Sequence, residues 1–462
     1  MHPSKVMVAD GPGLRDRLTP YVPRLAIEWL QKEPGALFRR VEGTLTFVDI
    51  SGFTKMCERL ARKGKVGAEE VNDVLDVCFT EFLSIAYDDG GGVVKWGGDA
   101  VLILYTGVEH ALRACRSAHR MRRKLRDVGS RLQTSAGLVT LRMSVGIHSG
   151  GFDVFLAGGL HREMVITGPG ATTTAEMESL AQAGEIVLSP ATVGLVDPVV
   201  LGRPRGVGRL LAREPCGPVF DRARPIGNIG DIDLMSCLPL GIREHLLEGQ
   251  GEAEHRRVAI AFIEFSGTDE LLNRSGPEGV WDALDELIRR VQEAVRDQAV
   301  TFFETDIGKD GGKIMLIAGA PRSVGDEEER MLRALRSIVD ETAALSVRAG
   351  INTGYVFAGD FGPPYRRTYS VKGDAVNLAA RVMARAAPGQ ILATTDVLER
   401  SRAIFDVTPL DPFFVKGKKH PVQAFAIGPM TGTKRARRIE LPMAGRDQEL
   451  QTVLTSLEEA RR

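Results

Sequence analysis

The pattern of apolar and polar positions predicts the same succession of strands and helices twice along the chain. In its first occurrence, residues 44–49 are mostly β-branched or aromatic, as is typical of a buried strand, and a turn follows at Ser51 and Gly52. Apolar residues then recur at the spacing of one helix face, at Val71, Leu75, Cys78, Phe79 and Phe82. We therefore expect a strand that leads directly into a helix.

A β-hairpin is expected after this helix, with strands near 92–95 and 100–105, because the glycines of the intervening WGGD allow a tight reversal. The rest of the unit follows in order: a helix at 109–128, strands near 141–148 and 163–167, a helix at 172–182 and a strand at 185–188. Helices and hairpins that alternate in this way predict an α+β sandwich, in which helices cover one side of a single sheet.

The duplication is also visible as sequence similarity. Four blocks match in the same order: TFVDISG at 46–52 with AFIEFSG at 261–267, KWGGDAVLIL at 95–104 with KDGGKIMLIA at 309–318, VGIHSG at 145–150 with AGINTG at 349–354, and GEIVLS at 184–189 with GQILAT at 389–394. Ordered agreement of this kind indicates a tandem domain duplication.

The duplication sets the predicted domain boundaries. We expect an N-terminal helical segment at 1–40, a first domain at 41–195, a linker at 196–255, a second domain at 256–430 and a C-terminal linker at 431–462. In the N-terminal segment, YVPRLAIEWLQKE predicts an amphipathic helix with Pro23 in its first turn, packed on the first domain. The linker between the domains is rich in Gly, Pro and Arg, with a short helix predicted near 239–248.

Composition and charge narrow the class of protein. The 60 basic and 60 acidic side chains give a formal net charge of zero, so we expect no nucleic-acid partner, and we interpret the arginines of 109–128 as a solvated helix face. No apolar run predicts a membrane span, and the N-terminus has no signal-peptide pattern. The five cysteines have no metal-ligand spacing, so we expect buried thiols in a reduced cytoplasm.

Two carboxylates of the first copy are candidate metal ligands. Asp49 ends the first predicted strand and Asp99 lies in the hairpin turn, so adjacent antiparallel strands can bring both to one rim of the sheet. Hard cations held by few carboxylates keep phosphate oxygens as further ligands, which suits a metal pair that binds a triphosphate. The ISGF turn offers backbone N–H groups and a helix N-terminus to the phosphates. The second copy has Glu264 and Lys313 at the matching positions, and a lysine cannot bind a cation.

The second copy carries the complementary feature. In TYSVKGDAVNLAAR (368–381), Asn377 and Arg381 are four residues apart on one predicted helix face. An amide and a guanidinium so placed can bind a ribose and a phosphate whose negative charge grows during reaction. The first copy has Thr172 and Glu176 instead. This division predicts a single composite site between the two domains.

Each candidate also has an ordinary structural alternative: a helix cap for Asp49, a hairpin turn for Asp99, a solvated turn for Lys309, and a surface pair for Asn377 and Arg381. Trp96 and His148 are expected to be packing residues rather than ligands. The joint occurrence of the candidates, in order and split between the copies, favours the functional interpretation.

The chain resembles the class III nucleotidyl cyclases, and most of all the soluble, bicarbonate-responsive type of adenylyl cyclase with two unequal catalytic domains. The resemblance covers about 41–430 and rests on FVDISGFT, KWGGDA, VNLAAR and FVKGKKHPVQAF. It implies two tandem cyclase-type α/β sandwich domains that form an intramolecular pseudo-heterodimer. Many bacterial relatives continue into an ATPase domain, and LPMAGRDQEL resembles the segment before one, although GxxxxGK[ST] does not occur.

The resemblance also implies a role for each candidate residue. Two divalent ions, magnesium or manganese with calcium as a further candidate, would be held at Asp49, Asp99 and Ile50, with Phe53 and Thr54 beside the substrate. Lys309 and Ser370 would recognise the base as an adenine-type pair, and Asn377 and Arg381 would stabilise the transition state. Lys416 would bind the terminal phosphates. Lys95 would lie close to the active site and to a bicarbonate pocket.

Two positions depart from the family pattern. Relatives have Arg or Lys two residues before the Gly of VGIHSG to meet the triphosphate, whereas this chain has Ser144. Arg142 lies two residues earlier, on the same face of the strand, and is the candidate substitute. The arginine that binds bicarbonate in the soluble type aligns with Ala175, which argues against bicarbonate control.

The sequence therefore predicts an adenylyl cyclase that converts ATP to 3′,5′-cyclic AMP and pyrophosphate at one site between the domains, by a two-metal mechanism. The alternatives are a guanylyl cyclase and a catalytically silent nucleotide-sensing module that regulates an attached domain. No side chain is an obvious general base.

Overall fold

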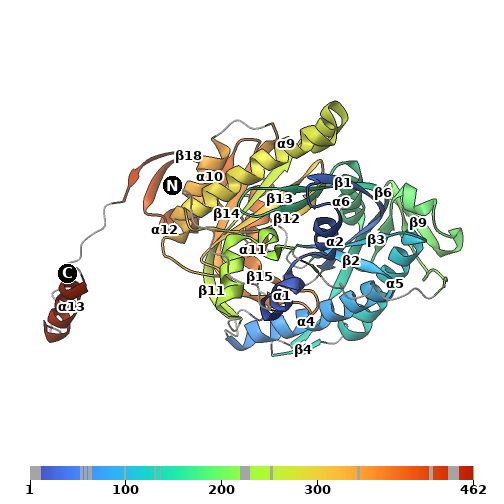
Figure 1. Cartoon of the computed structure of the whole chain (residues 1–462), viewed down its shortest axis with the longest axis horizontal. Coiled ribbons are helices and arrows are strands. Elements are labelled where there is room, and N and C mark those ends of the chain that lie inside the picture. The colour runs from blue at the N-terminus through green and yellow to red at the C-terminus, as the bar shows by residue number, and fades with distance from the viewer. Residues whose placement is uncertain are drawn as a thin grey trace.

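The computed structural model describes two α+β domains that pack against each other. The described residues are 12–51, 56, 60, 65–97, 100–129, 132–135, 137–218, 229–230, 232–249, 253–340, 344–415, 420–434 and 447–460. Figure 1 shows the first domain in blue to green on the right and the second in yellow to orange on the left. Each domain contains one eight-stranded sheet, and the two sheets have the same strand order. The predicted duplication and fold class are confirmed.

The first sheet has the order β2-β3-β1-β6-β8-β10-β9, with β7 paired to β6. Its strands are β1 (Phe38–Ser51), β2 (Gly91–Gly97), β3 (Ala100–Thr106), β6 (Arg142–Ala157), β7 (Glu163–Thr167), β8 (Ile186–Leu188), β9 (Leu201–Arg205) and β10 (Gly208–Leu211), and a separate short hairpin is formed by β4 (Leu132–Thr134) and β5 (Gly137–Val139). Because β10 pairs with β8, β9 pairs with β10 and Leu211 is buried, this sheet continues past residue 195, where the linker was predicted to begin.

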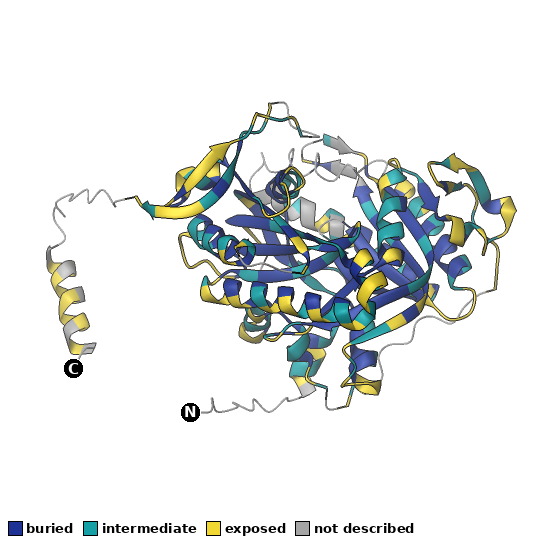
Figure 2. Ribbon diagram, turned by 90° about the horizontal axis from the view of Figure 1, so that it is seen from above, coloured by how far each residue is buried: buried dark blue, intermediate teal, exposed yellow. Residues whose placement is uncertain are grey.

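The second sheet repeats the arrangement as β12-β13-β11-β14-β16-β18-β17, with β15 paired to β14. Its strands are β11 (Glu254–Ser266), β12 (Thr301–Gly308), β13 (Gly311–Ala318), β14 (Ser346–Phe361), β15 (Thr368–Lys372), β16 (Ile391–Thr394), β17 (Ala403–Pro409) and β18 (Ala424–Thr433). Much of β17 and β18 is exposed, as is the C-terminal helix α13 (Asp447–Ala460), whereas most of the other strands are buried (Figure 2).

The helices occur in corresponding places of the two domains. The first domain has α4 (Lys65–Asp88), α5 (His110–Gly129), α6 (Pro169–Leu180), α7 (Pro190–Val193) and the 3₁₀ turn η2 (Pro198–Val200); the linker has η3 (Leu234–Cys237) and α8 (Leu240–Glu248); the second domain has α9 (Thr268–Asp297), α10 (Glu327–Val339), α11 (Asp374–Met383) and α12 (Thr395–Arg400). The linker helix was predicted at 239–248, within one residue of α8.

Both faces of each sheet are covered, rather than one as predicted. In β1, Val48 and Ile50 point toward α4 and α5 and join a core with Phe79 and Phe82. Leu45 points the other way, into a core that both domains share. This second core is possible because the interdomain contact buries the face that an isolated sandwich would leave in water, which is favourable for apolar side chains.

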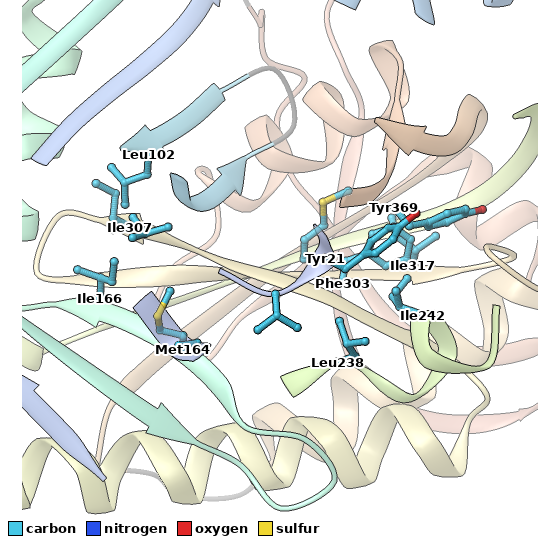
Figure 3. Packing of buried hydrophobic residues seen from close by; sticks show 14 of the residues in the cluster. Tyr21, Leu102, Met164, Ile166, Leu238, Ile242, Phe303, Ile307, Ile317 and Tyr369 are labelled. Atoms are coloured by element: carbon cyan, nitrogen blue, oxygen red, sulfur yellow. The ribbon is translucent and has the colours of Figure 1, made fainter. Parts of the chain in front are cut away.

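The shared core holds the domains together. Figure 3 shows side chains from the first domain, the second domain, the N-terminal segment and the linker in one cluster: Leu102, Met164 and Ile166, then Phe303, Ile307, Ile317 and Tyr369, then Tyr21, then Leu238 and Ile242. Because all four parts of the chain contribute, the relative position of the domains is fixed by hydrophobic burial and not only by the linker.

The N-terminal segment bridges the two domains. It contains α1 (Pro12–Leu18), η1 (Thr19–Tyr21) and α2 (Arg24–Lys32), which lie between the domains in Figure 1. The Tyr21 hydroxyl donates to Oδ1 of Asp360 at 2.9 Å, and the carbonyl of Pro20 accepts from Nη1 of Arg366 at 3.0 Å. The predicted helix and its packing on the first domain are therefore confirmed, and the segment also contacts the second domain.

The basic face of α5 is only partly solvated. Arg116 is buried and pairs with Asp89, with Nη2 and Oδ1 2.5 Å apart, and it also donates to the carbonyl of Pro218 at 2.7 Å. Buried guanidinium groups need such partners because desolvating an unpaired charge is costly. This face of α5 therefore anchors the chain after β10, which the prediction of a solvated face missed.

Candidate active site

Asp49 lies at the end of β1, at the interface between the domains. It is half-buried, and its ladder partners are Ala100 on β3 and Ser144 on β6. By the alternation of strand residues, its side chain shares the face of Leu45, which belongs to the core common to both domains. Ile50 points to the opposite core and is 1 % exposed, so only its main chain is available to a ligand.

The other predicted residues of this rim, Asp99, Phe53 and Thr54, lie outside the described residues. In the part of the chain that the structure describes, no group of three His, Cys, Asp or Glu side chains could hold a metal ion. Of the two predicted carboxylate ligands, the structure thus describes only Asp49, on the interface face of the sheet.

The matching rim of the second domain is occupied by its own side chains. Glu264, the counterpart of Asp49, forms an ion pair with Arg348. Its partner across the ladder is Lys313, whereas Asp49 faces Ala100. The guanidinium group of Arg348 already neutralises the Glu264 carboxylate, which disfavours a metal ion there.

Helix α11 carries the predicted phosphate-binding residues. Its buried face packs on β14, where Gly350 is required because a Cβ there would lie 2.1 Å from the backbone nitrogen of Met383. Asn377 and Arg381 are half-buried on the remaining face. Among the described residues, the buried Nη1 of Arg381 has no hydrogen-bond partner. A buried donor without a partner is costly, so this atom suits an acceptor on a ligand.

Lys309 does not lie where the sequence analysis placed it. The register pairs Lys95 with Leu102 in the first hairpin and Glu304 with Met315 in the second, so Glu304 is the counterpart of Lys95. Lys309 lies in the turn between Gly308 and Gly311, because the second hairpin is longer. The sequence match between KWGGD and KDGGK aligned glycine turns that are not at equivalent positions, so the assignment of Lys309 as the partner of Ser370 is corrected.

Lys309 instead faces the first domain. Its Nζ lies 3.2 Å from Oε1 of Glu176 on α6, and the neighbouring Asp310 donates its backbone N–H to Oγ1 of Thr172 at 2.8 Å. Thr172 also donates to Oδ2 of Asp269 at 2.8 Å. These contacts join the domains directly at the position that mirrors Asn377 and Arg381. The place where the pseudo-symmetry of the domains would put a second site is thus filled by side chains of the protein.

Ser370 is buried on β15, and its Oγ has no hydrogen-bond partner among the described residues. Lys372 lies two residues on, hence on the same face of the strand, with Nζ 4.9 Å from the ring centre of Phe361. Burial raises the pKa of Glu304 to about 8, although the charge of Lys372 opposes this. These three side chains form a polar group on the second domain that the predicted pair of Lys309 and Ser370 did not contain.

Lys95 belongs to a buried network that crosses the interface. Its ammonium group pairs with Glu163 on β7 and donates to Oγ1 of Thr305 on β12 at 2.8 Å. Oγ1 of Thr305 also donates to Oε1 of Glu163 at 2.8 Å, and Nε2 of His161 lies 3.5 Å from Oε2 of Glu163. Burial alone would raise the pKa of Glu163, but Lys95 and His161 outweigh it and lower the pKa to about 2.

This network leads us to expect that loss of the Glu163 charge destabilises the folded protein. Because Glu163→Gln leaves the buried Lys95 without a counter-charge, the free energy of unfolding should fall by about 3–5 kcal/mol in urea titrations. The folded-state pKa of Glu163 lies below its ordinary value, so its contribution should be present above about pH 4.5 and lost as the pH falls toward 2. The double variant Lys95→Met, Glu163→Leu should recover most of the loss. Equal stability of wild type and Glu163→Gln would contradict the assignment.

Arg142 begins β6 opposite Ser51, two residues along the ladder from the Asp49–Ser144 pair. It is exposed and lines a hollow of about 460 Å³ with Arg122 and Arg126 of α5. Ser144 itself donates to Oε1 of Glu178 at 3.0 Å. The structure therefore places Arg142 beside Ser51, the last residue of β1. Lys416, the other predicted phosphate ligand, lies outside the described residues.

Residues 39–203 and 251–428 match the family described as the adenylate and guanylate cyclase catalytic domain. The chain is 24% identical over 391 residues to adenylate cyclase type 10 of Homo sapiens and 24% identical over 386 residues to that of Oryctolagus cuniculus, in each case covering 74% of this chain and 24% of the relative. It thus spans about a quarter of the length of these relatives.

An uncharacterized protein of Mycobacterium tuberculosis is 31% identical over 154 residues, which cover 32% of this chain and 27% of that protein. Among solved structures, a class III adenylyl cyclase-like ATP-binding protein from Pseudomonas aeruginosa superposes with a TM-score of 0.57 at 13% identity, covering 79% of this chain and 85% of that one. This likeness concerns the fold, and it extends over both domains. In the described part of the chain, no helix has the length and apolar character that a membrane crossing needs.

Proposed function

The chain belongs to the family of adenylate and guanylate cyclase catalytic domains, and from this premise we propose that it converts ATP to 3′,5′-cyclic AMP and pyrophosphate at one site between its domains. The proposal rests on one observation: the residues of the site are divided between the two domains. Asp49 lies on the interface face of the first domain, and Arg381 on the second has a buried N–H with no partner among the described residues. The mirror positions are occupied by the Glu264–Arg348 and Glu176–Lys309 ion pairs.

Each residue has a defined task in this reaction, in which the ribose 3′-oxygen attacks the α-phosphorus and pyrophosphate leaves. Asp49 and Asp99, with the main chain of Ile50, would hold two divalent ions. Bound ions of this kind neutralise the triphosphate and favour ionisation of the attacking hydroxyl. Arg381 stabilises the charge that develops on the α-phosphoryl group, and Asn377 orients the ribose. Phe53, Thr54, Arg142 and Lys416 contact the phosphates.

Base recognition falls to Ser370, Lys372 and Glu304 of the second domain. At pH 7 the raised pKa keeps Glu304 largely protonated, so its carboxyl group can donate a hydrogen bond to a ring nitrogen of adenine. The ionised form can only accept, which suits the N–H groups of guanine. The names of the mammalian relatives favour ATP. Because the ionised carboxyl group of Glu304 would suit guanine, a guanylyl cyclase is the second candidate function.

This base assignment predicts a pH-dependent preference. As the pH rises through about 8, Glu304 should ionise, and the ratio of kcat/KM for ATP to that for GTP should fall by about tenfold. Glu304→Gln, which always offers both a donor and an acceptor, should make the ratio independent of pH. Lys309→Ala is the control and should leave the ratio unchanged, because Lys309 pairs with Glu176. A flat ratio in the wild type from pH 7 to 9 would remove Glu304 from base recognition.

The experiment that tests the function is product formation. Purified protein with magnesium or manganese should release cyclic AMP from ATP faster than cyclic GMP from GTP. Nucleotide binding without any cyclic product would favour the silent sensing module instead. We expect no stimulation when bicarbonate is added to the same assay, because Glu163 neutralises Lys95 and Ala175 offers no cation. A cytoplasmic location is part of the same proposal.

A further inference from the structure

A hollow with basic walls lies in the first domain, between α5 and the start of β6. It has a volume of about 460 Å³. Its walls come from the second half of α5, the first residues of β6 and the segment that leads into β8. Leu125, Leu141 and Met143, which line it, are each at most 2 % exposed and belong to the core of the first domain. The shape of the hollow is therefore fixed by the packing of this domain.

Three arginines line this hollow: Arg122 and Arg126, one helical turn apart on α5, and Arg142 on β6. Among the residues that the structure describes, none of the three lies within ion-pair distance of a carboxylate. Nη1 of Arg122 donates to the carbonyl of Leu211 at 3.3 Å, but its buried Nε has no hydrogen-bond partner there. Positive charge is thus concentrated in one hollow without a counter-charge from the described part of the chain.

Glu185, the single carboxylate among the residues that line the hollow, is already paired with other groups. Its Oε2 lies 3.0 Å from Nε of Arg205, and its Oε1 lies 3.6 Å from Nη2 of Arg203. Oε2 also accepts the backbone N–H of Gln182 at 3.0 Å. Because β9 supplies two guanidinium groups to this one carboxylate, Glu185 does not offset the charge of the three arginines in the hollow.

An ordinary structural role explains only one of these arginines. Arg126 lies in the last turn of α5, where a cation is favourable beside the C-terminal carbonyl groups. Arg122 lies one turn earlier, and like charges four residues apart destabilise a helix. Burial lowers the pKa of Arg122, and the charge of Arg126 lowers it further. A repulsive arrangement of this kind in a concave place is typical of a site whose counter-charge comes from a bound anion.

We infer that this hollow binds an oligophosphate anion, either free pyrophosphate or the triphosphate of a nucleotide, between Arg122, Arg126 and Arg142. A planar guanidinium group offers pairs of donors that match phosphate oxygens, and three such groups on two walls suit an anion with several phosphate oxygens better than a monocarboxylate. Arg142 is also assigned above to the substrate phosphates, so an occupied hollow would compete for it and lower turnover. Only that consequence rests on the proposed function, because the binding itself needs no reaction.

The test is isothermal titration calorimetry of the full chain with pyrophosphate, in a buffer with EDTA so that no divalent ion holds phosphates at Asp49. We expect about one site with a dissociation constant on the order of a hundred micromolar. Arg126→Gln should weaken binding about tenfold, because it removes charge-assisted hydrogen bonds. Arg123→Gln is the matched control and should bind as the wild type does, because Arg123 is exposed on the same helix but pairs with Glu214 and does not line the hollow.

Further titrations separate the two sources of the anion and the two sites. Competition by ATP that is at least as strong as that by pyrophosphate would assign the hollow to the triphosphate of a nucleotide, and weaker competition would assign it to free pyrophosphate. Adenosine, which has no phosphate, should not compete. Arg381→Ala should leave the binding of pyrophosphate unchanged, because Arg381 belongs to the proposed nucleotide site.

The inference is overturned if the wild type shows no saturable binding of pyrophosphate, or if Arg126→Gln binds it as tightly as the wild type. It is also overturned if Arg123→Gln loses as much affinity as Arg126→Gln, which would indicate general attraction to a basic helix. An equal loss in Arg381→Ala would place the pyrophosphate in the nucleotide site instead. A failure to form cyclic nucleotides would contradict the proposed function but not this site, because no step of the titration needs turnover.

Discussion

Replacing Asp49 by asparagine should lower the rate of cyclic nucleotide formation by at least about a thousandfold. The amide keeps the size of the side chain but removes the negative charge that would hold the ions, and this charge stabilisation supplies several kcal/mol of the barrier. Steady-state assays of cyclic AMP formation, with magnesium and with manganese, measure the effect. Asp99→Asn should behave in the same way.

The duplicated fold supplies a matched control for this experiment. Glu264→Gln makes the equivalent change on the second domain, at a carboxylate that is paired with Arg348 and faces Lys313. It should retain turnover within a few-fold of the wild type. Equal losses in Asp49→Asn and Glu264→Gln would mean that charge at the strand ends supports folding rather than metal binding. Near-normal turnover by Asp49→Asn would remove Asp49 from the site.

Arg381→Ala should lower kcat by about a hundredfold to a thousandfold and change KM much less. The expected split follows from its role, because a guanidinium group that meets charge formed during reaction stabilises the transition state more than the bound substrate. Initial-rate measurements over a range of ATP concentrations separate the two parameters. Arg381→Lys should recover only part of the loss, because an ammonium group lacks the planar fork of donors.

The control for Arg381 is its mirror residue, Glu176. Glu176→Gln removes the ion pair with the exposed Lys309 but touches no residue of the proposed site. We expect a small effect on turnover, since surface ion pairs contribute little to stability. A loss in Glu176→Gln as large as that in Arg381→Ala would indicate that both symmetric positions carry activity, and the single composite site would then be wrong.

The sequence predicted the elements of the fold well because each depends on local pattern. The helix expected at 109–128 is α5, and the strand expected at 163–167 is β7. Part of the asymmetry between the copies was also visible, because Glu176 stands at the position that mirrors Arg381. The match of Lys313 to Asp99 was wrong, because Lys313 pairs with Glu264 across the ladder as Ala100 does with Asp49. Trp96 and His148 pack edge-on against Phe79 and Phe152, as predicted.

Base recognition was not predictable in the same way. The match of KWGGD with KDGGK is convincing as letters, but hairpin register is fixed by which residues pair across the strands and by the length of the turn. Lys309 consequently lies against Glu176, and Glu304 takes the place that mirrors Lys95. Glu304 is found when the two hairpins are aligned by their paired strand residues, such as Asp306 with Lys313, and not by their glycines.

The amino-acid sequence was enough to predict a duplicated α+β protein, with Asp49 in one copy and Asn377 and Arg381 in the other. These conclusions rest on hydrophobic period and residue chemistry, which are local properties. The side chains that meet at the interface could be found only from the folded chain: the pairing of Lys95 with Glu163 and the ion pairs at the mirror positions. Contacts between residues distant in sequence depend on how two surfaces pack and on the register of their strands, and neither is written in a local pattern.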